Sequence, residues 1–251
     1  MEKIYSERIQ IAPVGFEIDR IVIPAIQGKA EKVYLMVHKN RTEDKAIKYA
    51  TRIKKKLTAA NIETEFVYAD WDNIEEITRV TRDLILREAN NEIAINLASG
   101  SKNHAIGLDR ACMTFRNRSN IHPFYPEAKK WTAWKYPKQQ STGVKKIKEI
   151  PIHRIIVPAP ELIDALKTLH RDSVNIPLHK GKKGVKKKDL ANSIFGSPHK
   201  TNLAKLQRNI TQKLEKTWRA IEIIEVGRSD WISLTAEGRY LRYILWNEET
   251  Y

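Results

Sequence analysis

Short apolar runs alternate with amphipathic stretches over the first 115 residues of this 251-residue chain, and this alternation most narrows the possible folds. Runs typical of strands lie at residues 8–14, 32–37, 62–69 and 92–97. Each is followed by apolar residues at helical spacing, within residues 16–26, 43–60, 73–90 and 103–115. Strands that alternate with helices form a mostly parallel sheet, because each helix crosses over one face. We therefore predict a doubly wound α/β fold for this part.

Details of these helices follow from single residues. Gly28 is expected to end the first helix, and Asp19 and Arg20 to lie on the face opposite its apolar stripe. Asp70 or Asp72 is expected to cap the third helix. The six basic residues on the outer face of the second helix are expected to be solvated.

The second half of the chain has a different pattern. We leave residues 116–145 unassigned, because prolines and aromatic residues obscure any period, and predict strands at 145–150 and 154–157. Helices are then predicted at 161–170, 188–195, 201–220 and 235–246, with a hairpin formed by 221–226 and 231–234 between the last two. This order is that of a winged helix-turn-helix, an α+β domain. We expect residues 1–157 to be one domain and 158–251 another.

Positive charge is concentrated in the second domain. The chain has a formal net charge of +15, and the 41 residues from His179 to Arg219 hold twelve Lys or Arg against two acidic residues. Clustered cations displace counterions from phosphates, so we predict double-stranded DNA as a partner. The run from Lys180 to Lys188 is expected to be a flexible arm on phosphates, with a solvated loop as the alternative. The candidate DNA-binding residues are Lys186, Lys187, Lys188, His199, Lys200, Thr201, Asn202, Lys205, Arg208 and Arg228.

A second candidate site lies in the first domain, where the sequence NLASGSK at residues 96–102 connects an apolar strand to a helix. Backbone N–H groups and the side chains of Ser99, Ser101 and Lys102 can converge there on an anion such as phosphate. The segment lacks the spacing of a Walker A loop or a dinucleotide fingerprint, and an ordinary tight turn is the alternative. The turn at residues 13–16 is expected to face the same crevice. Asp19, Asn103 and His104 are expected at its edges.

Catalytic and metal-binding patterns are scarce. The seven histidines show no metal-ligand spacing, and Cys112 is expected in the core, so we predict no metal and no cofactor. Ser101 and Lys102 could stabilise a departing phosphate oxygen, but no general base is evident. We therefore favour a binding protein over an enzyme. The single cysteine and the absence of a long apolar run favour a cytoplasmic protein without a membrane span.

Two motifs carry a family resemblance. APVGFEIDRI at residues 12–21 and NLASGSK at 96–102 resemble the turns of the CARF domain, the CRISPR-associated Rossmann fold. Ala98 and Ser99 stand where the family pattern has Thr or Ser and then Gly. SLTAEGRYL at residues 233–241 is similar to the wing and last helix of MarR-like regulators. The whole chain thus resembles archaeal transcriptional regulators in which a Rossmann-like CARF domain precedes a winged helix-turn-helix.

The resemblance implies a homodimer that binds a cyclic oligoadenylate or a related nucleotide in a cleft shared by two subunits. The implied ligand contacts are Gly15, Phe16, Asn96, Ser99, Gly100, Ser101 and Lys102, to which Asp19 is added from its place in the first helix. Some members cleave their ligand, so Ser101 and Lys102 would be catalytic in a metal-independent ring nuclease. An RNA-binding protein and a fold that only dimerises are further alternatives. The ligand, the operator, the sign of regulation and any link to CRISPR are open.

Overall fold

The computed structural model describes residues 5–115, 118–132, 138–152 and 158–245. The chain forms two compact units, Met1–Ile155 and Ile156–Tyr251, here called unit 1 and unit 2. Each unit is described by itself.

Unit 1 contains a six-stranded sheet with the order β3-β2-β1-β4-β5-β6. Its strands are β1 (Arg8–Pro13), β2 (Lys32–His38), β3 (Glu63–Ala69), β4 (Glu92–Asn96), β5 (Ile121–Trp131) and β6 (Ser141–Glu149). Its helices are α1 (Asp19–Gln27), α2 (Ile47–Ala59), α3 (Ile74–Arg87) and α4 (Lys102–Thr114). The first five strands are parallel, whereas β6 is antiparallel to β5. The predicted Rossmann-like fold is confirmed, with the strand order typical of dinucleotide-binding sheets.

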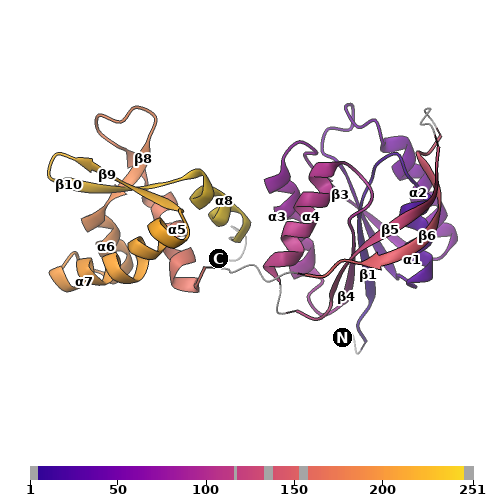
Figure 1. Cartoon of the computed structure of the whole chain (residues 1–251), viewed down its shortest axis with the longest axis horizontal. Coiled ribbons are helices and arrows are strands. Elements are labelled where there is room, and N and C mark those ends of the chain that lie inside the picture. The colour runs from indigo at the N-terminus through magenta and orange to yellow at the C-terminus, as the bar shows by residue number, and fades with distance from the viewer. Residues whose placement is uncertain (1–4, 116–117, 133–137, 153–157, 246–251) are drawn as a thin grey trace. The chain divides into compact units, whose positions relative to one another are not determined.

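The helices of unit 1 cover both faces of the sheet (Figure 1). One core layer joins alternate residues of β1, β2 and β4 to α3 and α4, and includes the free thiol of Cys112. The other layer joins β1 and β2 to α1 and α2. Strand β1 lies between β2 and β4, and the helices that follow β1 and β4 cover opposite faces of the sheet. The carboxyl ends of β1 and β4 therefore adjoin at the switch point of the topology.

The segment that the sequence left unassigned contains β5, the longest of the described strands. Pro123 and Pro126 lie within it, and a β-bulge falls between Glu127 and Ala128, so neither a regular alternation nor a typical strand composition is visible. Strand β6 begins at Ser141, four residues before the predicted start. The predicted strand at 154–157 lies outside the described residues.

Two predictions about helix residues in unit 1 are wrong. Arg20 is 2% exposed rather than on the outer face, because its guanidinium pairs with Glu17 at 2.7 Å and donates to the carbonyl of Pro126 at 2.8 Å. Helix α3 is capped by Asn73, whose side chain accepts from the Glu76 N–H, rather than by Asp70 or Asp72. Gly28 caps the end of α1 as predicted.

Unit 2 is an α+β domain with a small sheet in the order β7-β8-β10-β9. Its strands are β7 (Val174–Asn175), β8 (Lys183–Lys186), β9 (Ile221–Val226) and β10 (Ser229–Leu234). Its helices are α5 (Pro160–Asp172), α6 (Lys187–Phe195), α7 (Lys200–Leu206) and α8 (Ala236–Leu245). Their apolar faces meet in one core that includes Leu166, Leu190, Leu206 and Ile232.

Two predictions for unit 2 are corrected by the structure. The run from Lys180 to Lys188 is not a flexible arm, because Val185 pairs with Ile232 in the sheet and α6 begins at Lys187. The predicted helix at 201–220 is regular only in α7. It continues as two π-helical segments, Gln207–Thr211 and Lys213–Thr217, whose wider turns seat Ile210 and Leu214 in the core.

No helix within the described ranges of the chain is long and apolar enough to cross a membrane.

Candidate functional site: the turns after β1 and β4

The turns that follow β1 and β4 touch through two glycines. A Cβ atom on Gly15 would lie 2.9 Å from the Gly100 nitrogen, and Gly100 itself has a φ of +79°. A Cβ on Gly100 would lie 2.9 Å from the Cβ of Pro13 and 3.0 Å from Nδ1 of His104. Larger residues would force the two turns apart, so glycine keeps the backbone of both turns at one crevice. The predicted adjacency of these turns is thus confirmed.

Helix α4 begins at this crevice. Ser101 caps it by accepting from the His104 N–H at 3.4 Å, while Nδ1 of His104 accepts from the Ser101 N–H at 3.1 Å. The next two N–H groups, of Lys102 and Asn103, have no acceptor among the described residues. The ammonium of Lys102 is exposed and makes no ion pair with that part of the chain either. Unpaired donors at a helix N-terminus, next to a free cation, attract an anion.

Beneath the turn lie two side chains that solvent does not reach. Asn96 is fully buried, and its amide donates to the carbonyl of Arg20 at 2.8 Å and accepts from the Ala98 N–H at 3.0 Å. Asn96 therefore shapes the turn from below rather than facing the crevice. Ser99 is 2% exposed, and its hydroxyl has no hydrogen-bond partner in the described structure. A buried hydroxyl without a partner is rare, and it leaves one group free to bind water or a ligand at the turn.

His104 is fully buried and is held as a neutral imidazole. Its Nδ1 accepts the Ser101 N–H and lies 2.8 Å from the Ser101 Oγ, so the ring proton is assigned to Nε2. That nitrogen has no hydrogen-bond partner among the described residues. Burial lowers the pKa of His104 to about 4, and the nearby His38 adds to this effect. His104 therefore positions Ser101 and stays uncharged at neutral pH.

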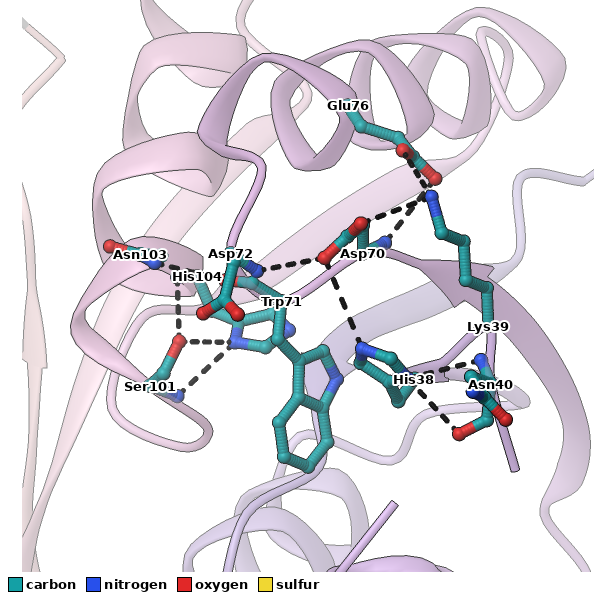
Figure 2. Close-up of polar contacts among 10 residues, drawn as sticks. All are labelled: His38, Lys39, Asn40, Asp70, Trp71, Asp72, Glu76, Ser101, Asn103 and His104. Atoms are coloured by element: carbon teal, nitrogen blue, oxygen red, sulfur yellow. Dashed lines mark hydrogen bonds and ion pairs between the residues drawn. The ribbon is translucent and has the colours of Figure 1, made fainter. Parts of the chain in front are cut away.

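The site extends to the ends of β2 and β3 through three rings (Figure 2). The Trp71 indole lies between the imidazoles of His104 and His38, with centroid distances of 5.7 and 5.4 Å in edge-to-face geometry. The amide of Asn103 donates to the Trp71 carbonyl at 3.0 Å, which ties the start of α4 to the loop after β3. Beyond His38, the Lys39 ammonium joins Asp70 at 3.1 Å and Glu76 at 3.2 Å. The N–H of Asp72, which donates to the Asp70 carboxylate, and then the Lys39 ammonium lower the pKa of Asp70.

The turn after β1 is held from the side of β6. The Gln139 side chain accepts from the N–H groups of Ile18 and Asp19 at 3.0 and 3.2 Å, and so caps α1 from a distant segment. The Asp19 carboxylate in turn accepts from the amide of Gln139 and from the Gly143 N–H. Asp19, a predicted ligand contact, is thus engaged in holding β6. Phe16 packs edge-to-face on Tyr49 of α2 at 5.5 Å.

A second candidate surface lies on unit 2. A cleft of about 450 Å³ opens between the turn after β9 and helix α7, and its lining includes Lys186, Lys187, Lys188 and Arg228. Lys187 pairs with Asp230 at 3.3 Å across this cleft. His199, Lys200, Thr201, Lys205 and Arg208 are exposed at or after the start of α7. Asn202 instead donates to the carbonyl and hydroxyl of Ser197, so its side chain orders the turn before α7.

Several residues of the first site escaped the sequence analysis. His38 is the last residue of β2, and Trp71 lies two residues after the end of β3. In parallel sheets the carboxyl ends of strands face the ligand crevice, so these positions could have been predicted. Gln139 contacts Asp19, which is 120 positions away in the sequence, so no local pattern predicts that contact. The same is true of Ser141, whose hydroxyl donates to the buried Glu17 carboxylate at 2.7 Å.

Known proteins match the chain in part. Residues 8–131, just under half of the chain, match the family model described as "HFX_2341_N:-like, N-terminal". The uncharacterized protein MJ1513 of Methanocaldococcus jannaschii is 29% identical over 187 residues. That match covers 65% of this chain and 56% of the relative, so the chain spans little more than half the length of the curated relative.

Solved structures give weaker matches. Can2 from Sulfobacillus thermosulfidooxidans, in complex with cyclic tetra-adenylate, is 11% identical with a TM-score of 0.42, over 94% of this chain and 63% of that one. Enterococcus italicus Csm6, bound to cyclic hexa-2'-fluoro-hexa-dAMP, is 12% identical with a TM-score of 0.38, over 52% and 36%. A type III CRISPR defence DNA nuclease activated by cyclic oligoadenylate is 14% identical with a TM-score of 0.39, over 49% and 19%.

Proposed function

We propose that unit 1 is a CARF-like sensing domain that binds a nucleotide, such as a cyclic oligoadenylate, through its phosphates at the turns after β1 and β4. The observation that carries this proposal is the set of free donors at one turn. The N–H groups of Lys102 and Asn103 and the Lys102 ammonium have no acceptor among the described residues, and the Ser99 hydroxyl beneath them has no partner. Phosphate oxygens are acceptors without donors, so they complement such a set.

The close contact of Gly15 and Gly100 supports the same proposal. Because neither glycine carries a Cβ, the two turns pack backbone against backbone, so a phosphate bound at one turn also lies beside the other. Trp71, half buried next to the start of α4, offers an aromatic surface near the phosphate site, where a base of the nucleotide can stack. The ligand contacts that we propose are Gly15, Phe16, Ser99, Gly100, Ser101 and Lys102.

Unit 2 is proposed to bind double-stranded DNA as a winged helix-turn-helix. Helix α7 would enter the major groove and carries exposed Lys200, Thr201 and Lys205, residue types that reach bases and phosphates. The turn after β9 would serve as the wing and places Arg228 beside the basic cleft. The whole protein is then a ligand-responsive transcriptional regulator that acts as a homodimer, because two copies of α7 would contact two half-sites of an operator.

The phosphate site is tested by isothermal titration calorimetry with cyclic tetra-adenylate as the probe. Lys102→Ala removes a free cation at the site, and we expect about tenfold weaker binding, the size of one charge-assisted contact. Lys29→Ala removes an exposed lysine after the end of α1, at the opposite end of the helix from the turn, and should leave the affinity unchanged. Equal affinities for wild type and Lys102→Ala would contradict the proposed site.

A ring nuclease is the second candidate function, and one contact favours it. The Ser101 Oγ lies 2.8 Å from Nδ1 of His104, an arrangement in which the imidazole can hold the hydroxyl proton. Mass spectrometry of cyclic tetra-adenylate incubated with the protein and with a chelator separates the two functions. A sensor returns the intact cyclic molecule, whereas a metal-independent nuclease yields linear products that are lost in Ser101→Ala.

A further inference from the structure

Unit 1 carries a larger share of the positive charge than the proposed DNA-binding unit. Unit 2 holds 17 Lys or Arg against 11 Asp or Glu, so nine of the fifteen net positive charges belong to unit 1. The phosphate site described above uses only Lys102. That site does not account for the rest of the positive charge of unit 1.

Helix α2 holds the densest part of this charge. From Lys45 to Asn61 the sequence contains six Lys or Arg and no Asp or Glu. The apolar face of α2, with Tyr49, Ile53 and Leu57, is buried in the core, so the basic residues are exposed on the opposite face. Cations three and four positions apart, such as Lys48, Arg52 and Lys55, place like charges close together on one exposed helix face.

The charge continues from α2 onto the hairpin of β5 and β6. The Tyr49 hydroxyl donates to the Lys138 carbonyl at 2.9 Å, and the Lys56 ammonium lies 3.8 Å from the Asp19 carboxylate. Asp19 also accepts from the Gly143 N–H at 2.9 Å. A Cβ on Gly143 would lie 3.3 Å from the Cβ of Lys129, so Lys129 of β5 lies beside Gly143 of β6. We call the exposed cations along this path the α2–hairpin surface: Lys48, Arg52, Lys55, Lys56, Lys129 and Lys138.

We propose that the α2–hairpin surface binds the phosphate backbone of duplex DNA, without regard to sequence. The surface has several cations spread over a helix and an adjacent hairpin, which matches a partner with phosphates at regular intervals. A membrane surface fits less well. The apolar side chains of α2 are in the core, and Trp131 and Ile147, 58% and 39% exposed, are the large exposed hydrophobic residues of the described part of the hairpin. Insertion into a bilayer needs a wider apolar face than this.

This proposal differs from the proposed function, because it concerns unit 1 and needs neither a ligand nor an operator. In the 251-residue chain it makes the sensing unit a direct DNA contact that adds to the contacts of unit 2. The signature of such a contact is the salt dependence of binding. Each phosphate that a cation neutralises steepens the fall of log K with log salt concentration by about 0.9.

The test measures fluorescence anisotropy of a 30-bp duplex of arbitrary sequence with the 251-residue chain across a range of NaCl concentrations. We expect the slope to become shallower by about 0.9 in Lys55→Gln and by about 1.8 in Lys55→Gln with Lys129→Gln. Lys29→Gln removes the same single charge outside this surface and should keep the wild-type slope. Lys200→Gln should also lower the slope if unit 2 binds DNA, and this arm reports on the proposed function separately.

Two results would overturn the proposal. One is a slope that does not change in the Lys55 and Lys129 variants, which would mean that these cations are only solvated. The other is binding of the wild type to vesicles with 30% phosphatidylserine that is lost in the double variant while the duplex slope stays the same. Circular dichroism of each variant confirms that the fold is intact, since all the altered side chains are exposed.

Discussion

At the scale of the residue, the site depends on side chains and glycines that set the backbone of the two turns. Asn96 and Ser99 lie beneath the turn after β4, and Gly15 and Gly100 bring the two turns into contact. The sequence was sufficient to locate this turn, because a polar segment that follows an apolar strand can be recognised from consecutive residues alone. It did not reveal that Asn96 is buried, because its partners include the carbonyl of Arg20, which is 76 positions away.

The contact of the two turns predicts the cost of adding one methyl group. Gly100→Ala should lower the free energy of unfolding by about 2–5 kcal/mol, because backbone strain at positive φ adds to a clash with Pro13. Gly143→Ala is the matched control, since Gly143 also has a positive φ but a Cβ there meets only the Lys129 side chain at 3.3 Å. We expect it to cost about 1–2 kcal/mol. Urea unfolding followed by tryptophan fluorescence measures both values, and equal costs would contradict the packing described.

The buried imidazole of His104 predicts a loss of stability in mild acid. Its pKa is about 4 in the folded protein, below the ordinary value of 6.5, so the unfolded chain binds the proton more readily between these values. Stability therefore falls as the pH drops from 6.5 toward 4, by about 3 kcal/mol from this residue.

The comparison is made by urea unfolding at pH 7 and pH 5. His104→Gln should be less stable than wild type at pH 7, but should lose less stability on acidification. If wild type and His104→Gln lost the same free energy between the two pH values, the assigned protonation state would be wrong.

At the scale of the element, the β5–β6 hairpin determines the shape of unit 1. It occupies the place where a further crossover helix would continue the alternation. The turn after β1 is held by Ser141, the first residue of β6, and by Gln139, which lies just before that strand. The strands and helices up to residue 115 could be predicted because each has its own hydrophobic period. The hairpin could not, because two prolines and a bulge interrupt β5. In unit 2, β8 was not predicted, because it has only four residues and two of them, Lys183 and Lys186, are charged.

The hairpin contact predicts a specific effect on α1. Gln139→Ala should cost about 1 kcal/mol, because it leaves the N–H groups of Ile18 and Asp19 without their acceptor. Gln140→Ala should cost little, because Gln140 joins the hairpin and the Phe16 carbonyl through its backbone alone. Amide hydrogen exchange of residues 18–22 should accelerate in the first variant and not in the second. Equal exchange in both variants would mean that Gln139 does not cap α1.

At the scale of the whole molecule, the chain joins a Rossmann-like unit with a candidate phosphate site to an α+β unit with a basic cleft. The net charge of +15 predicted a polyanionic partner, and the twelve Lys or Arg between residues 179 and 219 predicted that unit 2 binds it. The structure adds that unit 1 holds most of the net charge. We therefore propose that unit 1 senses the nucleotide, that unit 2 reads the DNA sequence, and that both units contact the DNA backbone.

The central claim is that a nucleotide bound at the turns after β1 and β4 changes the affinity of the same molecule for DNA. The most direct measurement is the Kd for a duplex selected from a randomised pool on the protein, determined by fluorescence anisotropy with and without cyclic tetra-adenylate. We predict a change of about 5- to 150-fold in the wild type, the range of a typical coupling free energy, and the same change in Lys102→Ala only at about tenfold higher nucleotide concentration. The same Kd with and without the nucleotide, under conditions in which calorimetry shows that it binds, would contradict the account.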